Sequence, residues 1–255
     1  MKPTFRAHFR ALLLAVLAGG LATAAAAEEV SVAVAANFSA PMQRIAAAFE
    51  SDTGHKAQLS FGATGMLYAQ IKNGAPFQVL LAADQQTPTK LVHEGAALAG
   101  SQFTYATGRL VLWSPKAGLV DDTGAVLKNA QLAHVSYCNP QLAPYGAAAV
   151  AAMKALGVFE TLQPKLVQAQ NIAQAYQFVA SGNAQIGFIA LSQVYRDGRI
   201  AQGSGWILPA ALYTPLHQDA VLLVNGQGHA GATELLAYLK SDKARALMRS
   251  YGYDP

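Results

Sequence analysis

A short stretch near the start of the chain decides how the polypeptide is built: Val30-Ser31-Val32-Ala33-Val34-Ala35-Ala36-Asn37-Phe38-Ser39-Ala40-Pro41. Its alternating first half is typical of a buried strand, and the helical spacing of Met42, Ile45 and Phe49 follows directly. The first N–H groups of such a helix have no partner within it. The turn between the strand and the helix, which we call a corner, can therefore bind a small anion without a charged side chain. Asn37 and Ser39 would add side-chain donors there, although ordinary turn formation and helix capping explain the same residues.

The same succession of strand, small polar corner and helix start occurs at three further places. These are Ser60–Gly65, Asn139–Gly146 and Gln170–Ala173. A single corner of this kind is an ordinary helix start. Four of them predict one binding site assembled from several helix N-termini.

The first 27 residues have the pattern of a secretory signal peptide. A basic start with Lys2, Arg6 and Arg10 precedes a short apolar run and Ala25-Ala26-Ala27, which fits cleavage near Ala27. Loss of these three basic residues lowers the formal net charge from +4 to about +1. The signal-peptide pattern predicts a periplasmic protein. Because no basic block remains, we expect that it does not bind nucleic acid.

Strand and helix patterns alternate along the remaining chain, which predicts an α/β fold with mixed sheets flanked by helices. Two long segments, Phe103–Ser114, which has a polar middle at Thr107-Gly108, and Tyr213–Val224, are interpreted as strands that cross between two lobes. The first lobe would contain residues 28–108 and 214–255, and the second lobe residues 109–213.

Motifs of enzymatic sites are missing from the sequence. There is no Gly-x-Ser-x-Gly, Cys-x-x-Cys, His-Glu-x-x-His or phosphate loop, and the histidines lack metal-ligand spacing. Cys138 lies in an apolar run and is expected to be a core residue. We therefore expect a protein that binds its ligand without transforming it and without a cofactor or metal ion. A secreted enzyme that uses Cys138 or Tyr145 is the alternative of a different class.

The donors expected at the four corners are uncharged hydroxyl and backbone N–H groups, and this indicates the class of ligand. Sulfate and molybdate carry no proton at neutral pH and need donors only, whereas hydrogen phosphate also needs an acceptor for its proton. The corners therefore predict a tetrahedral oxyanion, and both sulfate and molybdate remain open on these grounds.

The chain also resembles the periplasmic molybdate-binding proteins of ABC importers over nearly its whole length after residue 27. The motifs that carry this resemblance are Ala35-Ala36-Asn37-Phe38, Ser60-Phe61-Gly62-Ala63-Thr64-Gly65, Tyr68-Ala69-Gln70-Ile71, Asn73-Gly74-Ala75-Pro76, Ala82-Ala83-Asp84, Asn139-Pro140, Ala143-Pro144-Tyr145-Gly146 and Gln185-Ile186-Gly187-Phe188. The set is specific to this family, although no single motif is.

The resemblance implies a monomeric type II periplasmic binding protein whose lobes close on molybdate or tungstate and deliver it to an ABC permease. The family's ligand-binding positions fall on Ala36, Asn37, Thr64, Tyr145 and Ile172. Ala36 offers only a backbone N–H, and Thr64 replaces the usual serine but keeps a hydroxyl. Some members place a later tyrosine where this chain has Ala190, and Tyr145 is interpreted as its replacement.

Overall fold

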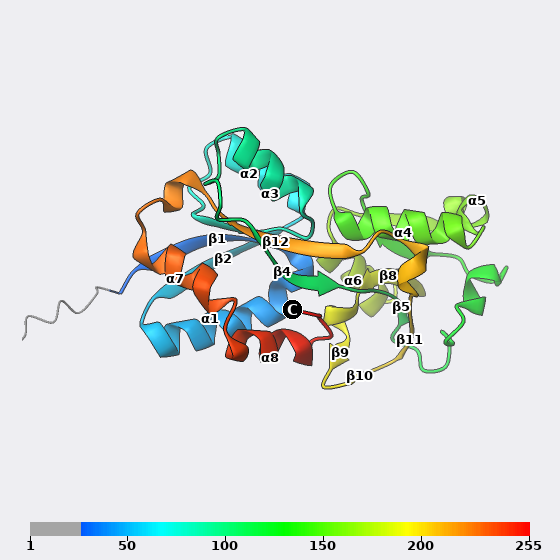
Figure 1. The fold of residues 1–255 in the computed structure, drawn as a ribbon. Coiled ribbons are helices and arrows are strands. Elements are labelled where there is room, and N and C mark those ends of the chain that lie inside the picture. Colours follow the sequence, from blue (N-terminus) through cyan, green and yellow to red (C-terminus); the bar gives the residue numbers. More distant parts are fainter. Residues whose placement is uncertain (1–26) are drawn as a thin grey trace, which may run out of the picture.

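Two lobes lie side by side in the computed structural model, which describes residues 27–255 (Figure 1). Each lobe has a five-stranded mixed sheet flanked by helices. The predicted two-lobed α/β fold is confirmed. Except for Ala27, the predicted signal peptide lies outside the described residues. Within residues 27–255, no helix combines the length and the apolar character that a membrane crossing requires.

The first sheet has the strand order β2-β1-β3-β12-β4. Its strands are β1 (Glu29–Ala35), β2 (Lys56–Gly62), β3 (Val79–Leu81), β4 (Phe103–Gly108) and β12 (Leu216–Leu222). Strand β1 runs parallel to β2 and β3, whereas β12 is antiparallel to β3 and β4. The helices of this lobe are α1 (Ser39–Thr53), α2 (Thr64–Lys72), α3 (Gln86–His93), α7 (Ala230–Tyr238) and α8 (Asp242–Ser250).

The second sheet has the order β11-β5-β8-β6-β7. Its strands are β5 (Leu110–Ser114), β6 (Val135–Cys138), β7 (Leu166–Ala169), β8 (Ile186–Ala190) and β11 (Ser204–Ile207). Here β6 runs parallel to β7 and β8, whereas β5 is antiparallel to β8 and β11. The helices are α4 (Pro144–Ala155), α5 (Phe159–Leu162) and α6 (Ile172–Ala180), and a small hairpin joins β9 (Tyr195–Arg196) to β10 (Arg199–Ile200).

The chain passes between the lobes twice. Strand β4 of the first sheet is separated from β5 of the second sheet by Arg109 alone, and residues 213–215 lead back to β12. Both crossing segments are therefore confirmed. The first lobe is built from both ends of the chain, and the C-terminus lies near the junction (Figure 1). The exact limits proposed for the lobes stay a prediction.

Local packing explains why the first corner forms where the sequence predicts it. Helix α1 buries Met42, Ile45 and Phe49 completely against the first sheet. Full burial of such a side chain stabilises the fold by about 1.5–3 kcal/mol. The helix ends at Gly54, which has a φ of 80° and therefore occupies the left-handed conformation that favours glycine. Apolar burial thus holds the N-terminus of α1 at the end of β1.

Candidate functional site

All four predicted strand-to-helix corners contribute to one small hollow between the lobes, which encloses about 200 Å³ of empty space. It is lined by Ala35, Ala36, Asn37, Gly62, Ala63, Thr64, Ala83, Ala143, Pro144, Tyr145 and Ile172. The structure therefore brings together every site position that the family resemblance implies. The hollow lies beyond the carboxyl ends of parallel strands β1, β2, β6 and β7, which is where ligands bind in open α/β sheets.

Backbone N–H groups are the most abundant donors at this hollow. Ala36 opens the short 3-10 helix η1 (Ala36–Phe38), Thr64 opens α2, and Ile172 opens α6. Tyr145 is the second residue of α4, after Pro144, which has no N–H. The N–H groups of a first helical turn have no partner within the helix. None of the lining residues carries a charge, so these donors suit a small anion.

The hydroxyl of Thr64 is oriented by the strand beside it. Its oxygen accepts a hydrogen bond of 3.1 Å from the backbone N–H of Ala83, and only 2 % of the residue is exposed. Thr64 does not cap α2, because Ala63 holds the capping position. Since the Thr64 oxygen is the acceptor toward Ala83, its proton stays available for another partner.

Tyr145, which also lines the hollow, has a hydroxyl that likewise accepts a hydrogen bond from within the protein. Its oxygen accepts from Nε2 of Gln218 at 3.2 Å, across the boundary between the lobes. Burial, together with the nearby Tyr253 hydroxyl, raises the pKa of Tyr145 well above its ordinary value. Tyr145 is therefore a neutral donor at physiological pH.

The prediction that Asn37 and Ser39 add side-chain donors to the site is wrong. Nδ2 of Asn37 donates to Oε1 of Gln218 at 2.8 Å and to the hydroxyl of Tyr253 at 2.9 Å. The hydroxyl of Ser39 donates to the carbonyl of Ala36 at 2.8 Å and does not cap α1. A buried amide must satisfy its donors within the protein, and both hydrogens of Asn37 are used in this way. Asn37 can therefore contribute to the hollow through its backbone.

Sequence reasoning missed a buried polar network under the hollow. It consists of Asn37, Tyr105, Tyr145, Ser192, Gln218 and Tyr253, all at most 5 % exposed. The polar run His217-Gln218-Asp219 within strand β12 is a signal that could have pointed to Gln218. Tyr253, two residues from the C-terminus, has no such signal.

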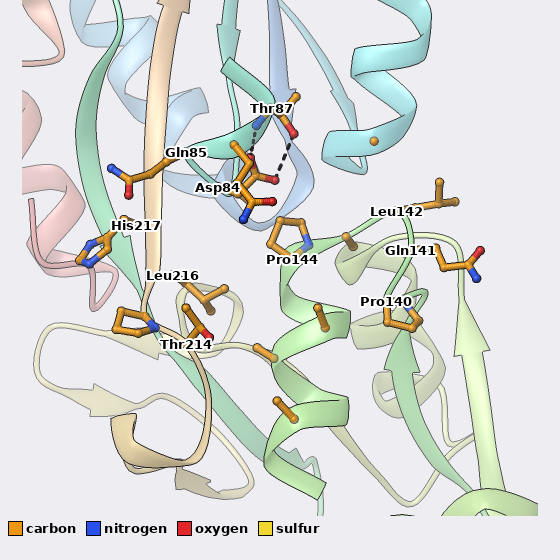
Figure 2. Close-up of a pocket in the computed structure, with 18 residues that line it drawn as sticks. Asp84, Gln85, Thr87, Pro140, Gln141, Leu142, Pro144, Thr214, Leu216 and His217 are labelled. Carbon is orange, nitrogen blue, oxygen red and sulfur yellow. Dashed lines mark hydrogen bonds between the residues drawn. The ribbon is translucent and has the colours of Figure 1, made fainter. Parts of the chain in front are cut away.

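A wider cleft with about 1380 Å³ of empty space opens beside the hollow (Figure 2). It shares Ala83, Ala143 and Pro144 with the hollow. The Asp84 carboxylate lies in this cleft and accepts from the backbone N–H and hydroxyl of Thr87 at 2.7 and 3.2 Å. Burial raises the pKa of Asp84, and the two Thr87 hydrogen bonds oppose that rise. A carboxylate repels an anion, so the hollow is the better candidate site.

The side chain of Cys138 has the properties of a core residue, as predicted. It is completely buried, and burial raises its pKa to about 12. A thiol must ionise to act as a nucleophile, so this environment does not activate it. Among residues 27–255, histidine, cysteine and acidic side chains nowhere gather in groups of three that could hold a metal ion.

Two lobes that enclose an uncharged, donor-lined hollow define a solute-binding protein for a small anion. The profile of the family described as bacterial extracellular solute-binding protein matches residues 30–254. The chain therefore belongs to this family.

Curated relatives and a solved structure place the chain more narrowly within that family. The molybdate-binding protein ModA of Azotobacter vinelandii is 58% identical over 242 residues, with 95% of this chain and 96% of the relative covered. ModA of Rhodobacter capsulatus is 51% identical over 251 residues, with coverage of 98% and 96%. The structure of an Azotobacter vinelandii periplasmic molybdate-binding protein superposes with a TM-score of 0.86 at 41% identity, covering 89% of this chain and 99% of that structure.

Proposed function

We infer that this protein captures molybdate between its two lobes and delivers it to the membrane permease of an ABC importer. The observation that carries the inference is the hollow, in which four helix starts present donors and no charged side chain takes part. Molybdate at neutral pH needs donors alone. Relatives that are named molybdate-binding proteins and share more than half of the residues support the same ligand.

The proposal assigns the ligand contacts to backbone N–H groups and two hydroxyls. The backbone donors are those of Ala36, Asn37 and Ile172, and the hydroxyls are those of Thr64 and Tyr145. A hydrogen bond to a charged group contributes about 1.5–3 kcal/mol. Five such bonds are sufficient for a micromolar dissociation constant, which requires about 8 kcal/mol after the costs of ordering.

The proposal also includes a monomeric protein that works in the periplasm and needs no cofactor. The similar Azotobacter structure is that of a periplasmic protein, and the family is described as extracellular, which supports the location. Light scattering on the purified mature chain tests the monomer, with a molar mass of twice the chain as the contradicting result.

A thermal-shift series tests the ligand directly. Molybdate and tungstate are expected to raise the melting temperature, because a ligand at a hundred times its dissociation constant stabilises the folded state by about 2.7 kcal/mol. Sulfate at the same concentration should produce no comparable shift, since it is the smaller ion and neutral donors select by the size of the hollow. Equal shifts with sulfate would contradict molybdate as the preferred ligand and would retain the class of protein.

A further inference from the structure

In the hydrogen-bond network under the hollow, donors and acceptors can be assigned one after another, starting from the backbone carbonyl of Asn37. The carbonyl of Asn37 accepts from the hydroxyl of Ser192 at 2.7 Å and from that of Tyr253 at 2.9 Å. A hydroxyl has a single proton, so one that donates to this carbonyl is an acceptor toward its other neighbours. The oxygen of Tyr253 accordingly accepts from Nδ2 of Asn37 at 2.9 Å.

The same assignment of donors and acceptors extends from the side chain of Asn37 to that of Gln218. The other Nδ2 hydrogen of Asn37 donates to Oε1 of Gln218 at 2.8 Å. The hydroxyl of Tyr105 lies within hydrogen-bond distance of the same oxygen, at 2.9 Å, and of the Ala82 carbonyl, at 3.1 Å. The amide donor of Asn37 at Oε1 holds the Gln218 amide in one orientation, with Nε2 toward Tyr145. Nε2 donates to the Tyr145 oxygen at 3.2 Å, so the Tyr145 proton is not used by Gln218.

Two backbone features place Gln218 in contact with Tyr145. Strand β12 shifts register against β4 between Gln218 and Asp219, and such a bulge changes the direction of a side chain beside a functional site. Gly108 supplies the space. A Cβ built there would lie 2.1 Å from the Tyr145 oxygen and 2.3 Å from Nε2 of Gln218. Gln218 itself is completely buried.

We propose that Gln218 is a positioning residue of the anion site, which acts through Tyr145 by directing the Tyr145 proton into the hollow. Gln218 does not line the hollow. Its Nε2 occupies the Tyr145 oxygen as a donor, so Gln218 leaves the Tyr145 proton free to point toward the ligand, with the Tyr253 hydroxyl as the competing neighbour. The inference rests on the proposed capture of molybdate.

A double-mutant cycle measures whether Gln218 acts through Tyr145. Gln218→Met is made alone and together with Tyr145→Phe, and the dissociation constant for molybdate is measured by calorimetry at pH 7.5. With Tyr145 present, Gln218→Met is expected to weaken binding about fivefold to tenfold, which is the usual size of one lost hydrogen bond. With Phe at position 145 the same change should weaken binding less than about twofold, because the two residues act as one unit.

The Gln218→Glu variant adds a pH-dependent readout when it is measured with and without Tyr145→Phe, because simple repulsion of the anion is the same in both backgrounds. Its carboxylate still accepts from Asn37 and Tyr105, so folding is retained, but it also accepts from Tyr145 and turns that proton away from the hollow. The pKa of a buried carboxyl is raised. We expect the affinity of this variant to fall at least about tenfold as pH rises from 5 to 8, whereas the parent stays flat.

Gln102→Met is the matched control. Nε2 of Gln102 donates to Asp219, the neighbour of Gln218 on β12, at 2.7 Å, and Gln102 does not line the hollow. Its affinity should equal that of the parent. Equal losses of molybdate affinity from Gln218→Met, with and without Tyr145→Phe, would overturn the inference. If Gln218→Met fails to fold, a flat pH profile of the folded Gln218→Glu protein would also overturn it. A parent protein that does not bind molybdate would instead overturn the proposed function, and this inference with it.

Discussion

The small hollow and the wide cleft beside it lie between the same two lobes, but their linings differ in charge. The hollow encloses about 200 Å³ and is lined by small residues, two hydroxyl-bearing side chains and helix N-termini. The cleft is larger, with about 1380 Å³ of empty space, and contains the Asp84 carboxylate and the His217 imidazole (Figure 2). The comparison favours the hollow as the anion site because of its neutral donors, although the cleft is the larger cavity.

The largest expected effect comes from placing a negative charge in the hollow. Thr64→Asp should abolish binding, because two unit charges about 4 Å apart repel by about 4 kcal/mol at an effective dielectric constant near 20. That energy corresponds to about a thousandfold loss of affinity. The carboxylate can still accept from the N–H of Ala83, as the hydroxyl does, and a first helical turn favours negative charge, so folding should be retained.

Calorimetry on the Thr64→Asp protein checks this expectation, with circular dichroism to confirm that it is folded. Thr64→Ser is the matched control, because it keeps the hydroxyl, and its affinity should stay within about threefold of the parent. A folded Thr64→Asp protein that binds molybdate within tenfold of the parent would show that Thr64 does not face the ligand.

A smaller loss is expected when the second hydroxyl is removed. Tyr145→Phe deletes one donor to a charged ligand and should cost about 1.5–3 kcal/mol, or about tenfold to a hundredfold in affinity. Tyr137→Phe is the control, because the Tyr137 hydroxyl donates to Gln168 on the surface of the same lobe at 2.7 Å. Indistinguishable dissociation constants for the two variants would remove Tyr145 from the site.

Removal of the Asp84 carboxylate from the wide cleft is expected to strengthen molybdate binding modestly. Asp84→Asn removes a carboxylate near the anion, keeps an oxygen that can accept from Thr87, and should strengthen molybdate binding about twofold to fivefold at low ionic strength. Because salt screens partly exposed charges, the gain should shrink at 0.5 M salt. Weaker binding by the variant would show that Asp84 has a direct role in holding the ligand.

The raised pKa of Asp84 also predicts that the free energy of unfolding depends on pH. Burial raises its pKa, so the folded protein favours the protonated carboxyl, and this contribution is lost as pH rises through the folded-state pKa. Asp84→Asn should therefore raise the unfolding temperature of the unliganded protein at pH 7. The advantage should disappear as pH falls below the ordinary range of an aspartate, and scanning calorimetry at both pH values measures it.

The smallest expected effect is that of pH on molybdate binding itself. Burial raises the pKa values of Tyr145, Tyr105 and Tyr253, so all three hydroxyls stay protonated through the neutral range. The dissociation constant should change less than about twofold between pH 6 and 8, because the donors of the hollow do not titrate there. A steep dependence would indicate that a titrating group outside the hollow contributes to binding.

Much of the fold follows from local patterns in the sequence. The alternation in β1 and the helical spacing of Met42, Ile45 and Phe49 place a strand and a helix correctly on either side of the first corner. The site positions came from the family resemblance, and the structure brings all of them to one hollow. The side-chain role assigned to Asn37 failed, because its partners Gln218 and Tyr253 lie 181 and 216 residues away along the chain.

The sequence by itself therefore determined the strands, the corners and the helix starts, because hydrophobic spacing and small polar residues act over a few neighbouring positions. Only the tertiary structure decided where the buried side chains of Asn37, Gln218 and Tyr145 point. Each of these polar groups must find a partner after burial, and the available partners come from distant segments that only the folded lobes bring together.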